Sequence, residues 1–121
     1  MSQTYLNWGR KNLALNGMTE RGHEFVQEDC LKWLERAQGT DQYDLIFMDP
    51  PTFSNSKRMQ DVLDIQRDHV RLITLAMGLL KPGGQLLFSN NLRRFKMERD
   101  ALKEFDIKDI TLQTIPKDFE R

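Results

Sequence analysis

Apolar positions recur at two different spacings along this chain, and together they predict alternating helices and strands. Spacings of three and four predict helices over residues 4–15, 30–38, 61–80 and 97–104. Short apolar or alternating runs predict strands over residues 23–28, 43–49, 85–89 and 107–115. This order is typical of a mostly parallel sheet with helices on both faces, so we expect an α/β protein with three layers, α/β/α.

The segments between these elements contain residues that end helices and start strands. Asn16-Gly17 predicts the end of the first helix, because glycine readily adopts the left-handed conformation there. Asp29 is expected to cap the second helix. The Lys-Pro-Gly-Gly run at 81–84 predicts a turn between the long helix and the strand that follows it.

The strand expected at 43–49 ends in an unusual turn, Asp49-Pro50-Pro51-Thr52-Phe53. Proline lacks an N–H group and fixes φ, so the strand cannot continue through it. The acid, backbone carbonyls and an aromatic ring are therefore expected together at the carboxyl end of this strand. In open α/β sheets ligands bind at that edge, so this turn is the leading candidate for a functional site. The alternative is a plain turn without a chemical role.

Basic residues follow the expected carboxyl ends of two strands. They form the runs Lys57-Arg58 and Arg93, Arg94 and Lys96, and Asn90-Asn91 precedes the second run. Parallel strands place both loops at one edge of the sheet, so we expect these residues to surround the turn at 49–53. The cations there would bind RNA phosphates, and the two asparagines could contact the substrate. The alternative is an ordinary run of solvated loop charges, with the asparagines as turn residues.

Composition narrows the function classes. The chain has 121 residues, 39% hydrophobic and 30% charged, as expected for one modest globular domain. Its 18 basic and 18 acidic residues balance, which argues against a polybasic nucleic-acid binder. No apolar run approaches the ~18 residues of a membrane span, so no membrane partner is expected. The single cysteine, Cys30, excludes an internal disulfide and a cysteine-based zinc cluster, which favours a cytoplasmic protein without a metal site.

His69 and Cys30 are weaker candidates for chemistry. His69 falls on the apolar face of the long helix, so we expect a hydrogen-bonded core histidine rather than a catalytic one. Cys30 is expected as a small packed residue. It follows a different strand from the turn at 49–53, which disfavours any mechanism that needs a thiol nucleophile beside that turn.

Several of these segments together resemble one protein family. The shorter signals lie at 25–29, 49–53 and 80–84, and the longer ones at 4–17, 50–59, 66–69 and 88–91. They are similar to the guanine-N7 module of the bifunctional bacterial 23S rRNA guanine methyltransferases. That module belongs to the class I methyltransferases, which use S-adenosylmethionine (SAM). The similarity covers nearly the whole chain, and the combination of segments is more specific than any single one.

The resemblance implies a cofactor site. Asp29 matches the acid that binds the adenine amino group of SAM, and Cys30 and Leu31 match positions beside the adenine ring. Asp49 and Pro50 match positions near the methionyl end of the cofactor.

The resemblance also implies a catalytic segment and a substrate. Pro51, Thr52 and Phe53 match the segment that meets the target base, so the catalytic candidates are the five residues of the turn at 49–53. The implied activity of the intact protein is SAM-dependent methylation of a guanine in 23S rRNA. Guanine N7 carries a lone pair and no proton, so this chemistry needs no strong general base.

The family's pattern extends beyond both ends of this chain. Its glycine-rich motif I and the acid that holds the cofactor ribose would lie before Met1, and its last strand after Arg121. The resemblance therefore implies one partial domain over 1–121, without the first two strands and the last strand of the parent sheet. We expect such a chain to be inactive and to bind SAM weakly or not at all. We also expect the strand around Phe25 to pair with the strand around Ile46, or free strand edges to pair between chains.

Two other function classes stay open at this point. One is a non-catalytic module that folds or self-associates but binds neither cofactor nor RNA by itself. The other is a nicotinamide-dependent α/β enzyme, which the lack of a G-x-G-x-x-G sequence disfavours.

Overall fold

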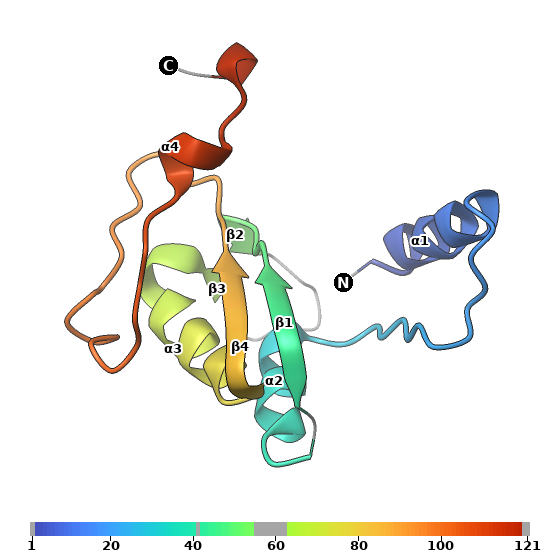
Figure 1. The fold of residues 1–121 in the computed structure, drawn as a ribbon, viewed down its shortest axis with the longest axis horizontal. Coiled ribbons are helices and arrows are strands. Elements are labelled where there is room, and N and C mark those ends of the chain that lie inside the picture. The colour runs from blue at the N-terminus through green and yellow to red at the C-terminus, as the bar shows by residue number, and fades with distance from the viewer. Residues whose placement is uncertain (1, 41, 55–62, 120–121) are drawn as a thin grey trace.

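The structure of the chain is a computed structural model that describes residues 2–40, 42–54 and 63–119. The elements in chain order are α1 (Gln3–Leu15), α2 (Cys30–Ala37), β1 (Tyr43–Met48), β2 (Phe53–Ser54), β3 (Leu63–Asp64), α3 (Ile65–Met77), β4 (Leu80–Phe88), α4 (Thr111–Thr114) and a 3-10 turn (Lys117–Phe119). Figure 1 shows β1 and β4 side by side, with α2 and α3 packed together and α1 standing apart from them.

β1 and β4 form a parallel pair, as the sequence predicts. Their register runs without interruption from Leu45 opposite Gln85 to Met48 opposite Phe88. Before Leu45 the register shifts, since Tyr43 pairs with Leu80 and Leu45 with Gln85. β4 begins at Leu80 rather than at the predicted residue 85, so residues 81–84 form an irregular part of the strand and not the separate turn expected from the sequence. A Cβ atom on Gly84 would lie 2.9 Å from the carbonyl oxygen of Lys81 and 3.1 Å from that of Asp44, so only glycine fits this position without a shift.

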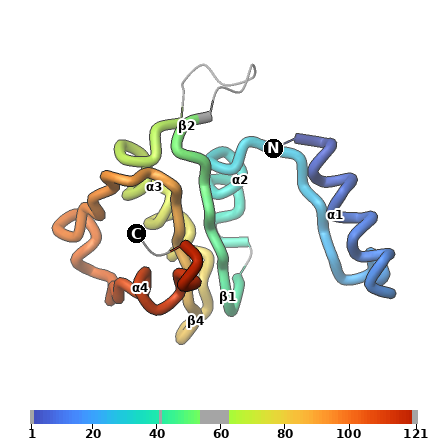
Figure 2. The backbone as a smooth tube through the Cα atoms, turned by 90° about the horizontal axis from the view of Figure 1, so that it is seen from above, coloured from blue at the N-terminus to red at the C-terminus, as the bar shows by residue number. Residues whose placement is uncertain are grey.

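The hydrophobic core lies on one face of this sheet. Its buried residues come from α2, α3 and the residue just before β4: Leu34, Ala37, Ile65, Leu72, Ala76 and Leu79. Both helices begin at side-chain caps. Asp29 accepts hydrogen bonds from the N–H groups of Leu31 and Lys32 at 2.9 and 3.1 Å, which confirms the predicted cap. Figure 2 shows α2 and α3 close to the strands, with α1 apart from them.

Asp64 caps α3 in the same way, and Asp68 supports that cap from within the helix. Asp64 accepts from the N–H of Gln66 at 3.0 Å, while its own N–H donates to Asp68 at 3.0 Å. The side-chain hydrogen bonds from Arg67 lower the pKa of Asp68, and partial burial opposes this effect. The helix therefore begins at Ile65, later than the predicted residue 61.

The opposite face of the sheet is open. The side chains of Leu45, Phe47 and Leu87 point to this face and are 58, 68 and 39% exposed. The α/β class and the parallel sheet are confirmed, but the described residues contain only one of the two expected helix layers. The accessible surface is 10054 Å², whereas a compact protein of this mass exposes roughly 6,800 Å². The chain therefore leaves far more surface uncovered than a complete domain would.

The strand predicted at 23–28 is not present, and the expectation that it pairs with β1 is wrong. This segment has no regular secondary structure and joins no sheet, and β1 pairs with β4 alone among the described residues. Phe25 instead packs against α1. A Cβ atom on Gly9 would lie 2.9 Å from the Phe25 ring, and the guanidinium of Arg10 lies 5.1 Å from the ring centroid. The Phe25 ring therefore packs against α1 and not against the sheet.

Two elements near the C-terminus also differ from the prediction. Residues 97–104 form successive turns rather than a helix, anchored by the fully buried Leu102. Residues 107–115 form no strand; they contain the short helix α4, whose start Asp109 supports by accepting from the N–H of Thr111 at 2.9 Å. Leu112 is 90% exposed, so the alternating pattern has no sheet to pack on.

Candidate functional site

The carboxyl ends of β1 and β4 are joined by a hydrogen bond between Asp49 and Ser89. The last paired residues are Met48 and Phe88, and the Ser89 N–H donates to the Met48 carbonyl at 2.9 Å. The Ser89 hydroxyl then donates to Asp49 Oδ1 at 2.8 Å. This bond fixes one oxygen of an exposed carboxylate at the predicted edge. Sequence analysis missed it, although both residues directly follow apolar strands that pair in register.

The rest of the turn is anchored to the start of α3. The N–H of Ile65 donates to the Thr52 carbonyl at 3.1 Å, and Phe53 in β2 pairs with Asp64 in β3. Pro50 and Thr52 are half-buried, and Pro51 is exposed. The Phe53 ring is 61% exposed, so an aromatic surface is available near Asp49. Phe53 belongs to β2, which pairs with β3 and not with the sheet of β1 and β4. That its ring meets the same ligand as Asp49 stays a prediction.

The other predicted cofactor residues lie at the start of α2. Figure 1 shows that α2 begins toward the end of the sheet where β1 finishes. Asp29 uses Oδ1 for both of its capping bonds, so its carboxylate already has a structural role. Leu31 packs against the core. Cys30 is exposed, which corrects the expectation of a packed residue. The cofactor role of these three residues stays a prediction.

The loop after β4 carries the second group of predicted residues. The side chains of Arg93, Arg94 and Lys96 are exposed, and the loop begins at Ser89, beside Asp49. Asn90 accepts from the N–H of Leu92 at 3.0 Å, which is the turn role left open by the sequence. Asn91 is exposed. The loop therefore starts at the predicted edge, and the role of its basic residues there stays a prediction.

Lys57 and Arg58, the other half of the predicted basic rim, lie outside the described residues. Phe95, which separates the cations of the loop after β4, points inward. Its ring lies 4.8 Å from the ring of His69 and 5.9 Å from that of Phe88, measured between centroids. In this loop the basic side chains are therefore exposed, whereas the Phe95 ring between them packs against the core.

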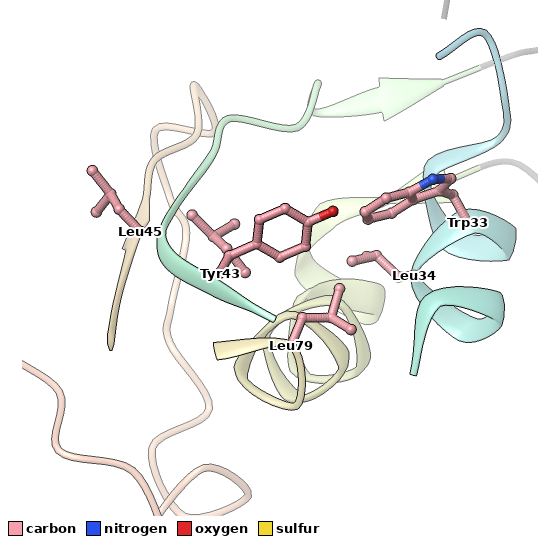
Figure 3. A pocket seen from close by; sticks show the side chains of 6 residues that line it. Trp33, Leu34, Tyr43, Leu45 and Leu79 are labelled. Atoms are coloured by element: carbon pink, nitrogen blue, oxygen red, sulfur yellow. The ribbon is translucent and has the colours of Figure 1, made fainter. Parts of the chain in front are cut away.

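An apolar hollow of about 230 Å³ lies elsewhere, beside β1 and α2. Figure 3 shows the rings of Trp33 and Tyr43 turned toward each other above Leu34 and Leu79; the two ring centroids are 6.4 Å apart. The lining contains no ionisable side chain apart from the Tyr43 phenol. Tyr43 is the first residue of β1, so this hollow lies toward the opposite end of the strand from Asp49. It does not belong to the candidate site.

Residues 2–40, 42–54 and 63–119 contain neither a metal-binding cluster nor a membrane-spanning helix. No cluster of three or more His, Cys, Asp or Glu side chains is arranged to hold a metal ion in this part of the chain. None of the described helices combines the length and hydrophobicity needed to cross a membrane.

The chain is similar in sequence to a segment of several longer proteins. No family model matches it. It is 58% identical over 121 residues to the ribosomal RNA large subunit methyltransferase K/L of Cellvibrio japonicus, and 53% identical over 121 residues to that of Allochromatium vinosum. Both matches cover the whole chain but only 16% of the relative, so the chain corresponds to about one sixth of these proteins.

Solved structures show the same fold. The SAM-dependent methyltransferase from Agrobacterium tumefaciens superposes with a TM-score of 0.69 and 22% identity, covering 77% of this chain and 30% of that one. A protein assigned as a methyltransferase and solved with SAH gives the same TM-score and identity, covering 85% of this chain and 26% of that one. The chain is therefore homologous over its full length to one segment of the ribosomal RNA large subunit methyltransferase K/L proteins, and it has the fold of the class I SAM-dependent methyltransferases.

Proposed function

We propose that this chain forms part of the catalytic domain of a SAM-dependent methyltransferase that modifies a guanine N7 in bacterial 23S rRNA, a reaction of the cytoplasm. The observation that carries the proposal is the joined edge of β1 and β4. There the Ser89 hydroxyl holds Asp49 at 2.8 Å, the exposed Phe53 follows four residues after Asp49, and the exposed basic loop starts at Ser89. The names of the relatives at 53–58% identity support the same reaction class.

The residues at this edge fit what SAM would require of them. SAM supplies an electrophilic methyl group on a positively charged sulfonium. The Asp49 carboxylate is exposed and oriented, so it can hold the cationic methionyl end of the cofactor nearby. Asp29, Cys30 and Leu31 at the start of α2 would border the adenine. The protein's remaining task is to align the nucleophile with the methyl group.

Guanine N7 is the acceptor atom most consistent with this site. It has a lone pair and no proton to remove, so the reaction needs no general base. His69, the buried histidine in this region, has both ring nitrogens engaged by backbone groups and is unsuited to proton transfer with a substrate. The exposed Phe53 ring could stack on the target base, an interaction worth ~1–3 kcal/mol.

The proposal is tested in a chimera, defined as the Cellvibrio japonicus relative in which this chain replaces the matching 121 residues. The chimera is expected to transfer methyl groups from SAM to large-subunit rRNA purified from cells that lack the modification. The isolated chain is expected to bind SAM weakly or not at all in a calorimetric titration. The product scored is N7-methylguanosine, because the other module of the bifunctional relative methylates rRNA independently. A folded chimera that forms no N7-methylguanosine would contradict the proposal.

Self-association of the isolated chain is a second candidate property, and the open face of the sheet favours it. Leu45, Phe47 and Leu87 are exposed there, and the outer edge of β1 has no strand partner among the described residues. Unpaired apolar edges tend to pair with a second copy. Sedimentation of the isolated chain is expected to show dimers or larger species, and Phe47→Lys is expected to shift the population toward monomer. A monomeric unmodified chain would exclude self-association.

A further inference from the structure

The basic loop after β4 is fastened to α3 by the side chain of Gln66. The Gln66 Oε1 accepts a hydrogen bond from the Lys96 N–H at 2.9 Å, and its Nε2 donates to the Lys96 carbonyl at 2.8 Å. One amide side chain thus satisfies both polar groups of the Lys96 backbone, as a neighbouring strand would. Thirty residues separate the two partners along the chain, so the contact fixes the loop relative to a distant helix.

His69, one helical turn further along α3, fastens the same loop at a second point. It is fully buried. Its Nδ1 lies 2.9 Å from the Gln66 carbonyl and 3.1 Å from the Ile65 carbonyl, so Nδ1 carries the proton. The Nε2 is therefore an acceptor, and it receives the Glu98 N–H at 3.1 Å. The sequence-based expectation of a hydrogen-bonded core histidine is confirmed.

These two side chains determine how the loop presents its charges. The backbone is held at Lys96 and Glu98, and the ring of Phe95, the residue before Lys96, packs edge-on against the His69 ring. With Phe95 directed inward, the side chains of Arg93 and Lys96 remain exposed. A loop ordered before binding loses less conformational entropy when it meets a ligand.

We infer that Gln66 and His69 are positioning residues for rRNA binding: they hold the basic loop at the edge of the sheet beside Asp49 without touching the RNA. This inference rests on the proposed function, in which Arg93, Arg94 and Lys96 contact rRNA phosphates. If His69 and Gln66 had only a structural role, replacing them would weaken rRNA binding and SAM binding to the same extent. Positioning residues for this loop should instead affect RNA binding and leave SAM binding intact.

The test compares variants of the chimera. Gln66→Met removes both bonds to Lys96 at similar volume, and His69→Phe removes the acceptor for Glu98 while keeping an aromatic ring. His69→Gln can supply an acceptor again. The matched controls Gln113→Met and His23→Phe make the same chemical changes at exposed positions. Three quantities are measured: the affinity for unmodified large-subunit rRNA, the affinity for SAM, and hydrogen exchange at the Lys96 and Glu98 amides.

The inference predicts a separation between the two affinities. Gln66→Met and His69→Phe should speed amide exchange in the loop and weaken rRNA binding by about five- to tenfold each, the effect of losing one or two hydrogen bonds. SAM affinity should stay within about twofold, since neither variant removes a contact of Asp49 or of the residues at the start of α2. His69→Gln should recover part of the rRNA affinity, and the two control variants should match the unmodified chimera.

Two results would overturn the inference while leaving the proposed function standing. One is faster exchange at Lys96 and Glu98 with unchanged rRNA affinity. The other is an equal loss of rRNA and SAM affinity, which would indicate a general structural role. Failure of the proposed function has a different signature, because replacing Arg93, Arg94 and Lys96 with Ala would then also leave rRNA affinity unchanged.

Discussion

Replacing Asp49 with Ala in the chimera is expected to slow methyl transfer to rRNA by roughly 100- to 1,000-fold. In the proposed site this carboxylate stabilises the positively charged end of SAM and helps align the methyl group with the base. Its orientation depends on the Ser89 hydroxyl at 2.8 Å, so Ser89→Ala should give a smaller loss of about tenfold. Single-turnover rates at saturating SAM and rRNA measure both effects.

Asp44→Ala is the matched control for this prediction. Asp44 is an exposed acid on the same strand, but it lies near the opposite end, where it pairs with Lys81 at 3.7 Å. Its loss should leave the rate of methyl transfer almost unchanged. If Asp49→Ala slows the reaction by less than about threefold, Asp49 has no role at the reacting atoms and the assignment of the site is wrong.

Replacing Arg93, Arg94 and Lys96 together with Ala is expected to weaken rRNA binding by roughly 100-fold at low salt and to flatten its salt dependence. Each lost phosphate contact lowers the slope of log K against log salt by ~0.7 for single-stranded RNA, so three contacts lower it by about 2. Filter binding over a range of salt concentrations measures the slope. SAM affinity should hardly change, since these side chains follow β4 rather than α2.

The control for this variant removes the same charge elsewhere. Lys11, Arg21 and Lys117 are exposed, and the first two lie in or next to α1, which stands apart from the sheet in Figure 1. Replacing all three with Ala should lower rRNA affinity much less than the loop variant does. Equal losses would show that only the total charge of the protein matters, and that the loop after β4 contributes no specific contact.

Sequence reasoning succeeded where an element contains its own signals. α2 begins at Asp29 because a carboxylate satisfies free N–H groups at a helix start, and β1 ends at Met48 because Pro50 and Pro51 cannot continue a ladder. Both statements depend on neighbouring residues alone. The position of Asp49 at the edge of the sheet follows directly from the second of them, and the parallel order places the loop after β4 at that edge too.

Sequence reasoning failed where a short apolar run needs a distant partner. Phe25 lies in such a run, but its ring packs on α1 under Arg10 instead of on a neighbouring strand. Leu112 alternates with polar residues, yet it is 90% exposed because no strand of the described sheet lies beside it. Strand propensity expresses fit to a half-buried surface, and without that surface the same residues adopt other conformations.

The contacts that organise the candidate site were also beyond sequence reasoning. The bond from Ser89 to Asp49 spans 40 residues, and the bonds from Gln66 to Lys96 span 30. They depend on the register of β1 and β4 and on the direction in which the loop leaves β4. Of these contacts, only those of His69 could be expected from the sequence, because a polar residue on the apolar face of a helix must find hydrogen-bond partners in the core.

The position of the transferred methyl group tests the central claim most directly. Unmodified large-subunit rRNA is incubated with the chimera and labelled SAM, and the modified nucleotide is identified by mass spectrometry after complete digestion. We predict that the label is found in N7-methylguanosine and disappears with Asp49→Ala. A folded chimera that places no label in N7-methylguanosine, or label in N7-methylguanosine that persists with Asp49→Ala, would contradict the account.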